Sequence, residues 1–195
     1  MPNLKYYKVH PNAITPAFAT QQSACFDLSF SNAGKNDYSG FNQYNKAFTR
    51  VFKDGNLYIG PHERIMVPTG LILDIPEGYS VRVHARSGIS LMQGLILANS
   101  EGVIDSDYIQ EVFVLLYNRS ENGLFINNGD RIAQAELIKD VEYQVVDSAV
   151  RPGVKTSRTG GMGSTGIKTV SELITINIDE SSPLKRLDKD RKSTR

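Results

Sequence analysis

The sequence predicts an all-β fold, either a sandwich or a barrel, with one short helix. From residue 57 onward, turn signals such as GPHE and PEGY recur about every ten residues, and β-branched and aromatic residues fill the segments between them. Short strands joined by evenly spaced turns are typical of sandwiches and barrels. In this part of the chain only SGISLMQ, residues 87–93, fits two helical turns, with Ser87 as the N-cap.

The N-terminal segments predict two further strands. Residues 4–9 alternate weakly and then meet Pro11 and Pro16, which suits an edge strand followed by a loop. Residues 23–30, SACFDLSF, follow as a short strand. Asp27 stands between two apolar residues in it, so its side chain is expected on the opposite face from theirs.

Residues 31–56 read differently, because they are rich in Asn, Gly and aromatic residues. Their aromatic residues recur at steps of three and four, which predicts an amphipathic helix inserted into the β domain. It would be a surface helix packed on the domain or a contact for a neighbouring subunit or partner protein. These residues are Tyr38, Phe41, Tyr44, Phe48 and Phe52.

Chain length predicts the number of domains, and net charge argues against one class of function. A chain of 195 residues suits one domain of about 150 residues plus extensions. The domain is expected to cover residues 1–166, and the charged segment 167–195 is expected to be a partly disordered extension with one further strand. A net charge of +1 argues against direct nucleic-acid binding, which usually needs a basic face.

Cysteine use and hydropathy predict a compartment. Cys25 is the one cysteine, so no internal disulfide forms and a reducing, cytoplasmic location is expected. The N-terminus lacks the apolar run of a signal peptide, and no stretch approaches the ~18 apolar residues of a membrane span. The three histidines, His10, His62 and His84, show no metal-ligand spacing.

The strongest candidate site lies in residues 97–117, LANSEGVIDSDYIQEVFVLLY. Asp105 follows a glycine and an apolar pair, with Asn99 and Tyr108 close by, and VFVLLY continues as an apolar strand. We expect a hairpin whose main-chain groups read a flat polar ligand while Asp105 handles a proton. An ordinary solvated turn is the alternative interpretation.

Two other segments predict phosphate binding. The helix at 87–93 follows Arg86 and Ser87, so helix N–H groups, a hydroxyl and a guanidinium are expected to converge there. Residues 158–166, RTGGMGSTG, form a glycine-rich strip of donors, although they lack the Walker pattern. Arg131, Gln134 and Lys168 add polar groups in the surrounding segments.

Five motifs in this order resemble the trimeric dUTPase family. They are SACFDLS (23–29), ARSG (85–88), EGVIDSDY (101–108), GDRIAQ (129–134) and RTGGMGSTG (158–166). The resemblance implies a β jelly roll (β-clip) fold. It also implies hydrolysis of dUTP to dUMP and pyrophosphate with Mg²⁺, in active sites shared between the chains of a homotrimer. Such an activity limits uracil incorporation into DNA and supplies dUMP for dTTP synthesis.

The resemblance also implies roles for single residues. Asp105 corresponds to the carboxylate that activates the water attacking the α-phosphorus, and Asp27 to a carboxylate that reaches Mg²⁺ through water. Uracil and sugar recognition falls to Asn99, Gly102, Val103, Ile104 and Tyr108. Phosphate binding falls to Arg86, Ser87, Gly88 and Gln134, and the closing arm comprises Arg158, Gly160, Gly161, Met162, Gly163, Ser164 and Thr165.

The chain departs from the family pattern at two places. Met162 stands where the arm usually carries an aromatic residue that stacks on the base, so a looser closed state is expected. Gln110 stands where the family often has glycine after the hairpin tyrosine.

Two other functions compete with dUTP hydrolysis. A dCTP deaminase shares the fold but carries a glutamate near the position of Leu115, and an apolar residue cannot relay protons there. A regulatory or binding module that acts through residues 31–56 is the second alternative.

Overall fold

The computed structural model describes residues 2–157 and residue 160. The chain divides into two compact units, residues 1–144 and residues 145–195. All named elements lie in the first unit. They are β1 (Lys5–Lys8), β2 (Ala17–Phe18), β3 (Phe26–Ser29), β4 (Asp37–Phe41), β5 (Ala47–Val51), β6 (Leu57–Ile59), β7 (Arg64–Pro68), β8 (Leu71–Asp74), β9 (Tyr79–His84), α1 (Ser87–Gln93), β10 (Leu95–Leu97), β11 (Gly102–Ile104), β12 (Phe113–Asn118), β13 (Leu124–Ile126) and β14 (Arg131–Lys139).

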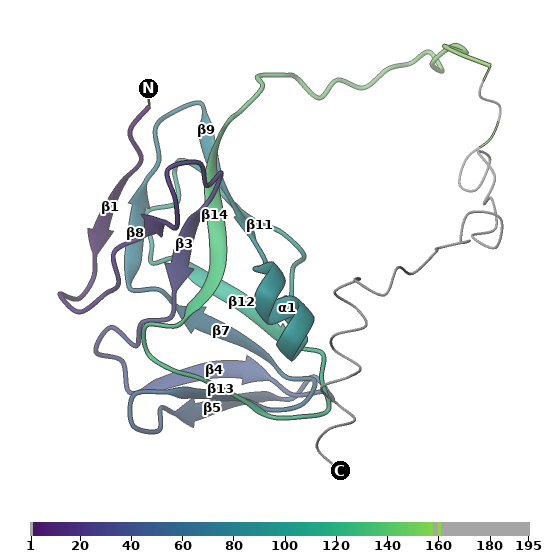
Figure 1. Cartoon of the computed structure of the whole chain (residues 1–195). Helices are drawn as coiled ribbons and strands as arrows, with labels where there is room; N and C mark the ends of the chain where they lie inside the picture. Colours follow the sequence, from purple (N-terminus) through teal and green to yellow (C-terminus); the bar gives the residue numbers. More distant parts are fainter. Residues whose placement is uncertain (1, 158–159, 161–195) are drawn as a thin grey trace, which may run out of the picture. The chain divides into compact units, whose positions relative to one another are not determined.

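Two five-stranded sheets form the body of the first unit (Figure 1). Their strand orders are β10-β12-β7-β4-β5 and β11-β9-β14-β3-β2, and two-stranded pairs β1-β8 and β13-β6 complete the fold. All of these strand pairs are antiparallel. The prediction of an all-β fold with one short helix is therefore confirmed.

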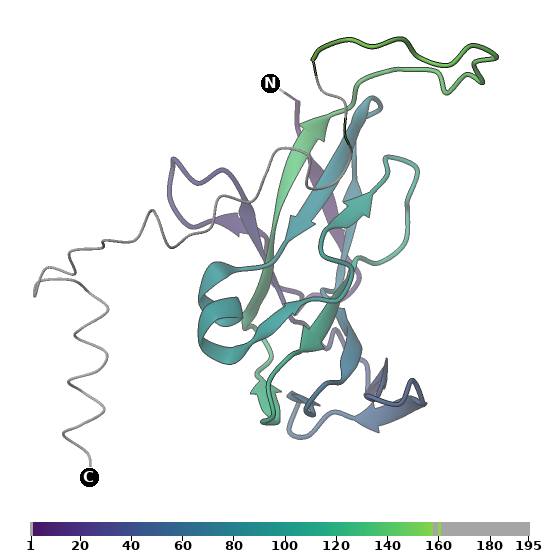
Figure 2. The ribbon, with the colours of Figure 1, turned by 90° about the vertical axis from the view of Figure 1, so that its right-hand side faces the viewer.

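The hydrophobic core draws residues from both large sheets into one cluster. Leu28 and Val81 come from one sheet, and Val67 and Val114 come from the other; all four are buried. Burial alternates along β12, as expected for a strand with one face toward the core. Figure 2 shows α1 on one side of the strands that carry this core.

The predicted helix in residues 31–56 is wrong, because this segment forms the hairpin of β4 and β5. Tyr38 is buried at 4% exposure, and its hydroxyl donates to Tyr58 O at 2.6 Å, whereas Tyr44 is 73% exposed. The two tyrosines therefore do not share one buried stripe. Asn42 Oδ1 accepts from the N–H groups of Tyr44 and Lys46, which fixes the turn that a helix would not contain.

The same hairpin is part of a large sheet, since β4 pairs with β7. Arg50 on β5 binds Glu63 with two hydrogen bonds of 2.9 and 3.0 Å, and its guanidinium lies over the ring of Phe48. Residues 31–56 are thus tied to the rest of the domain on both hairpin strands.

Helix α1 occupies the predicted residues, but its N-cap is Arg86, with no side-chain cap hydrogen bond. Ser87 is the first helical residue rather than the cap. Gly94 ends the helix in the left-handed conformation at φ 68° and donates to Ile89 O and Ser90 O. The hydroxyl of Ser87 is therefore not used as a cap.

Strands β10 and β12, which flank the polar turn predicted within residues 97–117, pair with each other as a hairpin requires, but the turn between them contains β11. β11 pairs with β9, whereas β12 pairs with β10 and β7 in the other sheet. Residues 105–112 connect the two sheets, and eight residues are longer than an ordinary hairpin loop. The connection therefore bridges two layers.

The second unit begins at Val145. Its described residues, 145–157 and 160, are exposed and lie outside helices and strands. The predicted boundary at residue 166 and the strand in 167–195 lie outside the described residues. Within the described part of the chain, no helix is long and apolar enough to cross a membrane.

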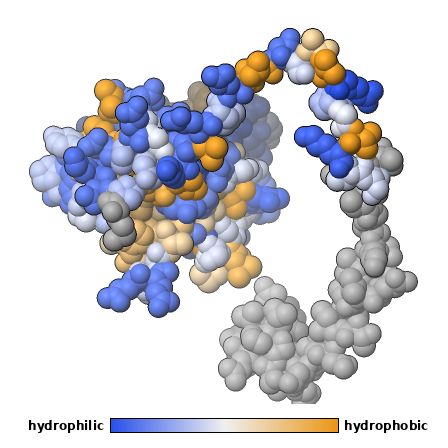
Figure 3. Space-filling view, turned by 90° about the horizontal axis from the view of Figure 1, so that it is seen from above, coloured by the Kyte–Doolittle hydropathy of each residue, from blue (hydrophilic) through white to orange (hydrophobic). Residues whose placement is uncertain are grey.

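Figure 3 shows one face of the surface, where hydrophilic side chains predominate and apolar ones form separate patches.

Candidate active site

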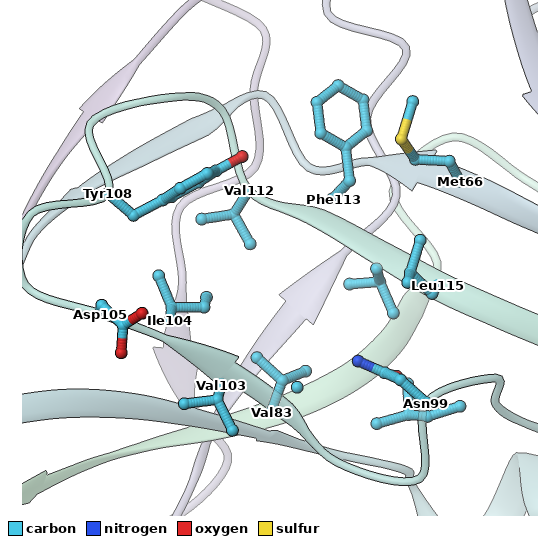
Figure 4. Close-up of a pocket in the computed structure, with 13 residues that line it drawn as sticks. Met66, Val83, Asn99, Val103, Ile104, Asp105, Tyr108, Val112, Phe113 and Leu115 are labelled. Carbon is cyan, nitrogen blue, oxygen red and sulfur yellow. The ribbon is translucent and has the colours of Figure 1, made fainter.

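A cavity of about 310 Å³ lies between β11 and the first half of β12 (Figure 4). All the predicted catalytic and base-reading residues line it: Asn99, Gly102, Val103, Ile104, Asp105 and Tyr108. Asn99 follows β10, and Asp105 and Tyr108 come from the connection between the sheets. The structure therefore brings together residues from both sides of β11.

Free strand edges face this cavity. β11 is the last strand in its sheet, so among the described strands only β9 pairs with it. β10 pairs with residues 116–118 of β12, and Ala98 N donates to Leu115 O. Within the part of the chain that the structure describes, Phe113 and Val114 have a strand partner only on the β7 side. Main-chain donors and acceptors are thus available next to the cavity, in the plane of each sheet.

Short-range hydrogen bonds shape the connection that carries Asp105. Tyr108 N donates to Asp105 O at 3.1 Å, and the Tyr108 hydroxyl donates to Glu111 O at 2.9 Å. The Asp105 residue is exposed. In Figure 4, Tyr108 and Asp105 lie on the opposite side of the cavity from Asn99.

Most of the apolar wall was missed by sequence reasoning. Val83, Leu97, Val112 and Val114 belong to the core as well as to the wall. Their apolar periodicity predicts burial but gives no sign of a ligand. The remaining wall residues are Met66, Phe113 and Leu115.

A second cavity of about 560 Å³ contains the predicted phosphate and metal residues of the described chain. Asp27, Arg86, Ser87, Gly88 and Gln134 line it. They come from β3, the start of α1 and β14. This cavity shares no lining residue with the first one.

Two arginines hold the carboxylate of Asp27. Arg86 Nε lies 3.0 Å from one oxygen, and Arg131 Nη1 donates to the other at 2.9 Å. Arg86 also donates to Arg131 O at 3.1 Å, and Gln134 Nε2 donates to Ala85 O at 3.1 Å. The side chains of Arg86 and Gln134, which would contact an anion, are therefore held in place by these contacts.

The same contacts test whether Asp27 suits Mg²⁺. Each oxygen already forms an ion pair with a guanidinium group, so direct coordination would compete with two ion pairs. A carboxylate keeps further lone pairs, and Mg²⁺ usually retains several of its waters. Asp27 therefore suits contact with Mg²⁺ through water and is a poor direct ligand.

Most of the predicted closing arm lies outside the described residues: Arg158, Gly161, Met162, Gly163, Ser164 and Thr165, as does Lys168. Gly160 is described and is exposed.

Comparison with known proteins identifies the family. A dUTPase family model matches residues 52–166, which is more than half of the chain. The chain belongs to the dUTPase family. The predicted resemblance to this family is thereby confirmed, and the enzyme is a dUTP diphosphatase, a hydrolase of nucleotide metabolism.

Curated relatives cover much of the dUTPase chain. The deoxyuridine 5'-triphosphate nucleotidohydrolase of Hydrogenobaculum sp. (strain Y04AAS1) is 38% identical over 115 residues, covering 59% of this chain and 79% of the relative. The Caulobacter vibrioides (strain NA1000 / CB15N) enzyme of the same name is 36% identical over 153 residues, covering 78% of this chain and 85% of the relative.

Solved structures share the fold. The Staphylococcus bacteriophage 80alpha dUTPase with dUPNHPP matches with a TM-score of 0.66 at 18% identity, covering 86% of this chain and all (100%) of that one. The dUTPase from Streptococcus mutans gives a TM-score of 0.58 at 19% identity, covering 74% and 100%. The predicted dUTPase-like fold is therefore confirmed.

Proposed function

We propose that this dUTPase hydrolyses dUTP to dUMP and pyrophosphate by attack of an Asp105-activated water on the α-phosphorus. This activity would limit uracil incorporation into DNA and supply dUMP for dTTP synthesis. The observation that carries the proposal is the grouping of the predicted residues into two cavities, one lined by Asp105 and the base-reading residues and one by the phosphate-binding residues.

The base is read at the first cavity. Uracil is planar and carries donors and acceptors along one edge, which suits the open strand edges of β11 and β12. Asn99 adds an amide that can both donate and accept. Cytosine would leave buried main-chain groups unpaired, and hydrogen-bonded sites of this kind discriminate by ~10⁴ or more.

Tyr108 is assigned to the sugar. Its ring lines the cavity, and its hydroxyl is held by Glu111 O. A fixed ring packs against deoxyribose and leaves no room for a 2'-hydroxyl. The discrimination against UTP is therefore assigned to Tyr108.

Asp105 is assigned as the general base. A carboxylate is ionised at neutral pH and accepts a proton from water, and such help is commonly worth ~10² to 10⁴ in rate. The exposed position of Asp105, at the mouth of the base cavity, leaves room for water and for the α-phosphate.

The phosphates are assigned to the second cavity. Arg86 supplies a guanidinium, Ser87 a hydroxyl, Gly88 a main-chain N–H group near the start of α1, and Gln134 an amide. Asp27 would contact Mg²⁺ through water, and the ion would neutralise charge on the phosphates when bound. In the solved structure of a mutant dUTPase from phage phi11 of S. aureus, a structural Mg(II) ion is coordinated.

The separation of the two cavities supports active sites shared between subunits. A dUTP molecule needs base-reading and phosphate-binding groups at once, and one chain presents them in cavities without common residues. We assign them to different subunits of a homotrimer, with the 158–165 arm of a third subunit closing the site.

A subunit-mixing experiment tests this sharing. Asp105→Asn removes the base-side function and Arg86→Gln removes the phosphate-side function, so each homotrimer should be nearly inactive. Refolding the two variants together should restore part of the wild-type rate, since some mixed sites contain neither substitution. Mixtures no more active than their separate components would contradict shared sites.

The activity itself is tested by pyrophosphate release from dUTP, dTTP, dCTP and UTP. Hydrolysis confined to dUTP, with a loss of ~10² or more in the rate of Asp105→Asn, is expected. An Asp105→Asn enzyme as fast as wild type would exclude the proposed general base. Asp107→Asn is the matched control, because Asp107 lies in the same connection but does not line the cavity.

A protein partner at residues 31–56 is a second proposal. The β4–β5 turn exposes Tyr44, and neighbouring Phe41 is 48% exposed. Exposed aromatic residues are common at protein interfaces. Loss of a co-purifying protein in Phe41→Ser/Tyr44→Ser, with dUTP hydrolysis intact, would support a partner, and unchanged interactions would remove this proposal.

A further inference from the structure

Three potential metal-binding side chains meet on one face of a sheet, from β9, from β14 and from the residue just before β3. Cys25, His84 and Glu136 each offer one ligand atom, and these atoms all lie within 4.8 Å of one another. His84 Nε2 and Glu136 Oε1 are 3.0 Å apart. The three strands run next to one another in one sheet (Figure 1).

The strand register explains why these residues share a face. Phe26, Val83 and Ala135 are neighbours across the sheet, and all three are buried in the core. Side chains alternate along a strand, so the residue next to each of them points away from the core. Cys25, His84 and Glu136 are those next residues, and each is half-buried.

The chemistry of this set favours a particular class of metal. Thiolate, imidazole and carboxylate together suit Zn²⁺ and similar borderline transition-metal ions, whereas Mg²⁺ prefers oxygen ligands. Bonds of about 2.0–2.3 Å place tetrahedral Zn²⁺ ligands roughly 3.5 Å apart, so small side-chain rotations would close the set around an ion.

Surrounding charges also favour a cation. The Cys25 thiol lies within 4.8 Å of the Glu136 carboxylate, so a cation bound between them would meet one full negative charge. Asp27 is neutralised by its two arginines, and Glu101 is shared by His84 at 3.6 Å and Arg82 at 4.0 Å. Among the described residues, His84 is the only basic side chain within 4.0 Å of the Glu136 carboxylate, and it is charged only when protonated.

We propose that Cys25, His84 and Glu136 form a site for a divalent transition-metal ion of the Zn²⁺ class, with water or Glu101 as the fourth ligand. Metal binding releases the thiol proton to solvent, moves the proton on the ligating ring nitrogen of His84 to the other ring nitrogen, and replaces the His84–Glu136 hydrogen bond with two metal bonds. This site is separate from the Mg²⁺ that accompanies dUTP. It borders the phosphate cavity, because Cys25 lines that cavity.

Cobalt provides a direct test that does not depend on catalysis. Co²⁺ is added to the untagged, nucleotide-free full-length protein, and a thiolate-to-cobalt charge-transfer band is expected in the near ultraviolet, saturating at one ion per chain. Zn²⁺ should displace Co²⁺ and abolish the band. Excess Mg²⁺ should leave it unchanged. A wild-type protein without the band would overturn the proposal.

Variants assign the ligands. Cys25→Ser should lose the band, and His84→Gln and Glu136→Gln should each weaken Zn²⁺ binding in equilibrium dialysis by about tenfold or more. His62→Gln is the matched control, since His62 and Glu121 form a comparable pair at 3.0 Å without a cysteine. Binding unchanged in both His84→Gln and Glu136→Gln, or weakened equally by His62→Gln, would overturn the assignment.

The rise in Tm caused by Zn²⁺ tests each ligand even when a variant is less stable than wild type, because each protein is compared with itself without the metal. A ligand that binds only the folded state raises Tm, and saturating Zn²⁺ should raise the wild-type Tm by roughly 5 °C. Folded variants lacking a ligand should show a smaller rise. A full rise in Cys25→Ser would place the metal elsewhere.

Discussion

Lys35 Nζ lies 2.6 Å from Glu111 Oε2, and this ion pair joins residues 31–56 to the connection that carries Asp105 and Tyr108. The other carboxylate oxygen of Glu111 accepts from Gly70 N at 2.9 Å. The Glu111 side chain is only 11% exposed. A mostly buried carboxylate held from two directions fixes one end of the connection that contains Asp105 and Tyr108.

Lys35→Met should therefore weaken both stability and substrate binding. Glu111 would keep a negative charge with one partner fewer, at a cost of about 1–2 kcal/mol in the free energy of unfolding. The KM for dUTP should rise as the connection loosens. Denaturant unfolding and steady-state kinetics measure the two effects, and Lys35→Met/Glu111→Gln should recover part of the lost stability. A double variant whose losses simply add would show that the pair is not coupled.

Gly102→Ala should push β11 away from β9. A Cβ at Gly102 would lie 2.9 Å from Val83 Cβ, closer than real Cβ atoms approach. A loss of about 1–3 kcal/mol in unfolding free energy is expected, as for overpacked cores, together with a higher KM because both residues line the base cavity. Gly153→Ala is the control, since its Cβ would meet nothing within 4 Å. Equal stability of the two variants would refute the steric argument.

Tyr108→Phe should raise the KM for dUTP about threefold to tenfold with little change in kcat. The substitution removes the 2.9 Å hydrogen bond to Glu111 O, worth about 1 kcal/mol, but keeps the ring. Steady-state kinetics measure the effects on KM and kcat separately. Ile109→Ala serves as a control, because Ile109 is exposed and does not line the cavity. An unchanged KM in Tyr108→Phe would mean that the hydroxyl does not order the ring.

Arg50→Met should cost about 2 kcal/mol in unfolding free energy, and this cost should not change from about pH 7 to about pH 10. Hydrogen bonding to Glu63 raises the pKa of Arg50 above its ordinary value. A raised pKa in the folded state gives stability that is complete below the unfolded-state pKa and is lost only as pH rises through the folded-state pKa. The folded-state and unfolded-state pKa values of Arg50 both lie above the range from about pH 7 to about pH 10. Denaturant unfolding of wild type and Arg50→Met at several pH values measures this difference in unfolding free energy. A difference that becomes smaller by about pH 10 would contradict a raised pKa for Arg50.

Local patterns predicted some strands well and their partners less well. The turns GPHE and PEGY separate β6 from β7 and β8 from β9, and SGISLMQ covers α1, whereas β13 and β14 were not predicted and β4 and β5 were predicted as a helix. The pairing of β11 with β9 rather than β12 depends on contacts between residues about twenty positions apart, which local periodicity does not contain.

The 31–56 segment shows why the periodicity of a few aromatic residues is a weak guide. Steps of three and four fit a helix, yet a strand, a turn and a strand produce the same spacing here. The better signal was the polar run containing Asn42 and Asn45, because Asn45 adopts φ 58° and Asn42 caps the turn. Asparagine tolerates the left-handed region and favours turns.

Residues that lie together in the structure were predictable where one motif contains them and were not predictable where only the fold gathers them. Asp105 and Tyr108 stand in one short motif, whereas Met66 reaches the same cavity from a distant strand. Cys25, His84 and Glu136 are separated by more than fifty positions at each step, so only the sheet register brings them together.

The base cavity shares its floor with the hydrophobic core, through Val83, Leu97, Val112 and Val114. Under the proposed assignment of this cavity to the base, a substitution there that changes base recognition also removes core packing, so selection for a new nucleotide preference would be opposed by loss of folded protein. Val103, Met66 and Leu115 line the same cavity from exposed positions. Changes in substrate preference during evolution are therefore expected at these rim positions before they occur at the floor.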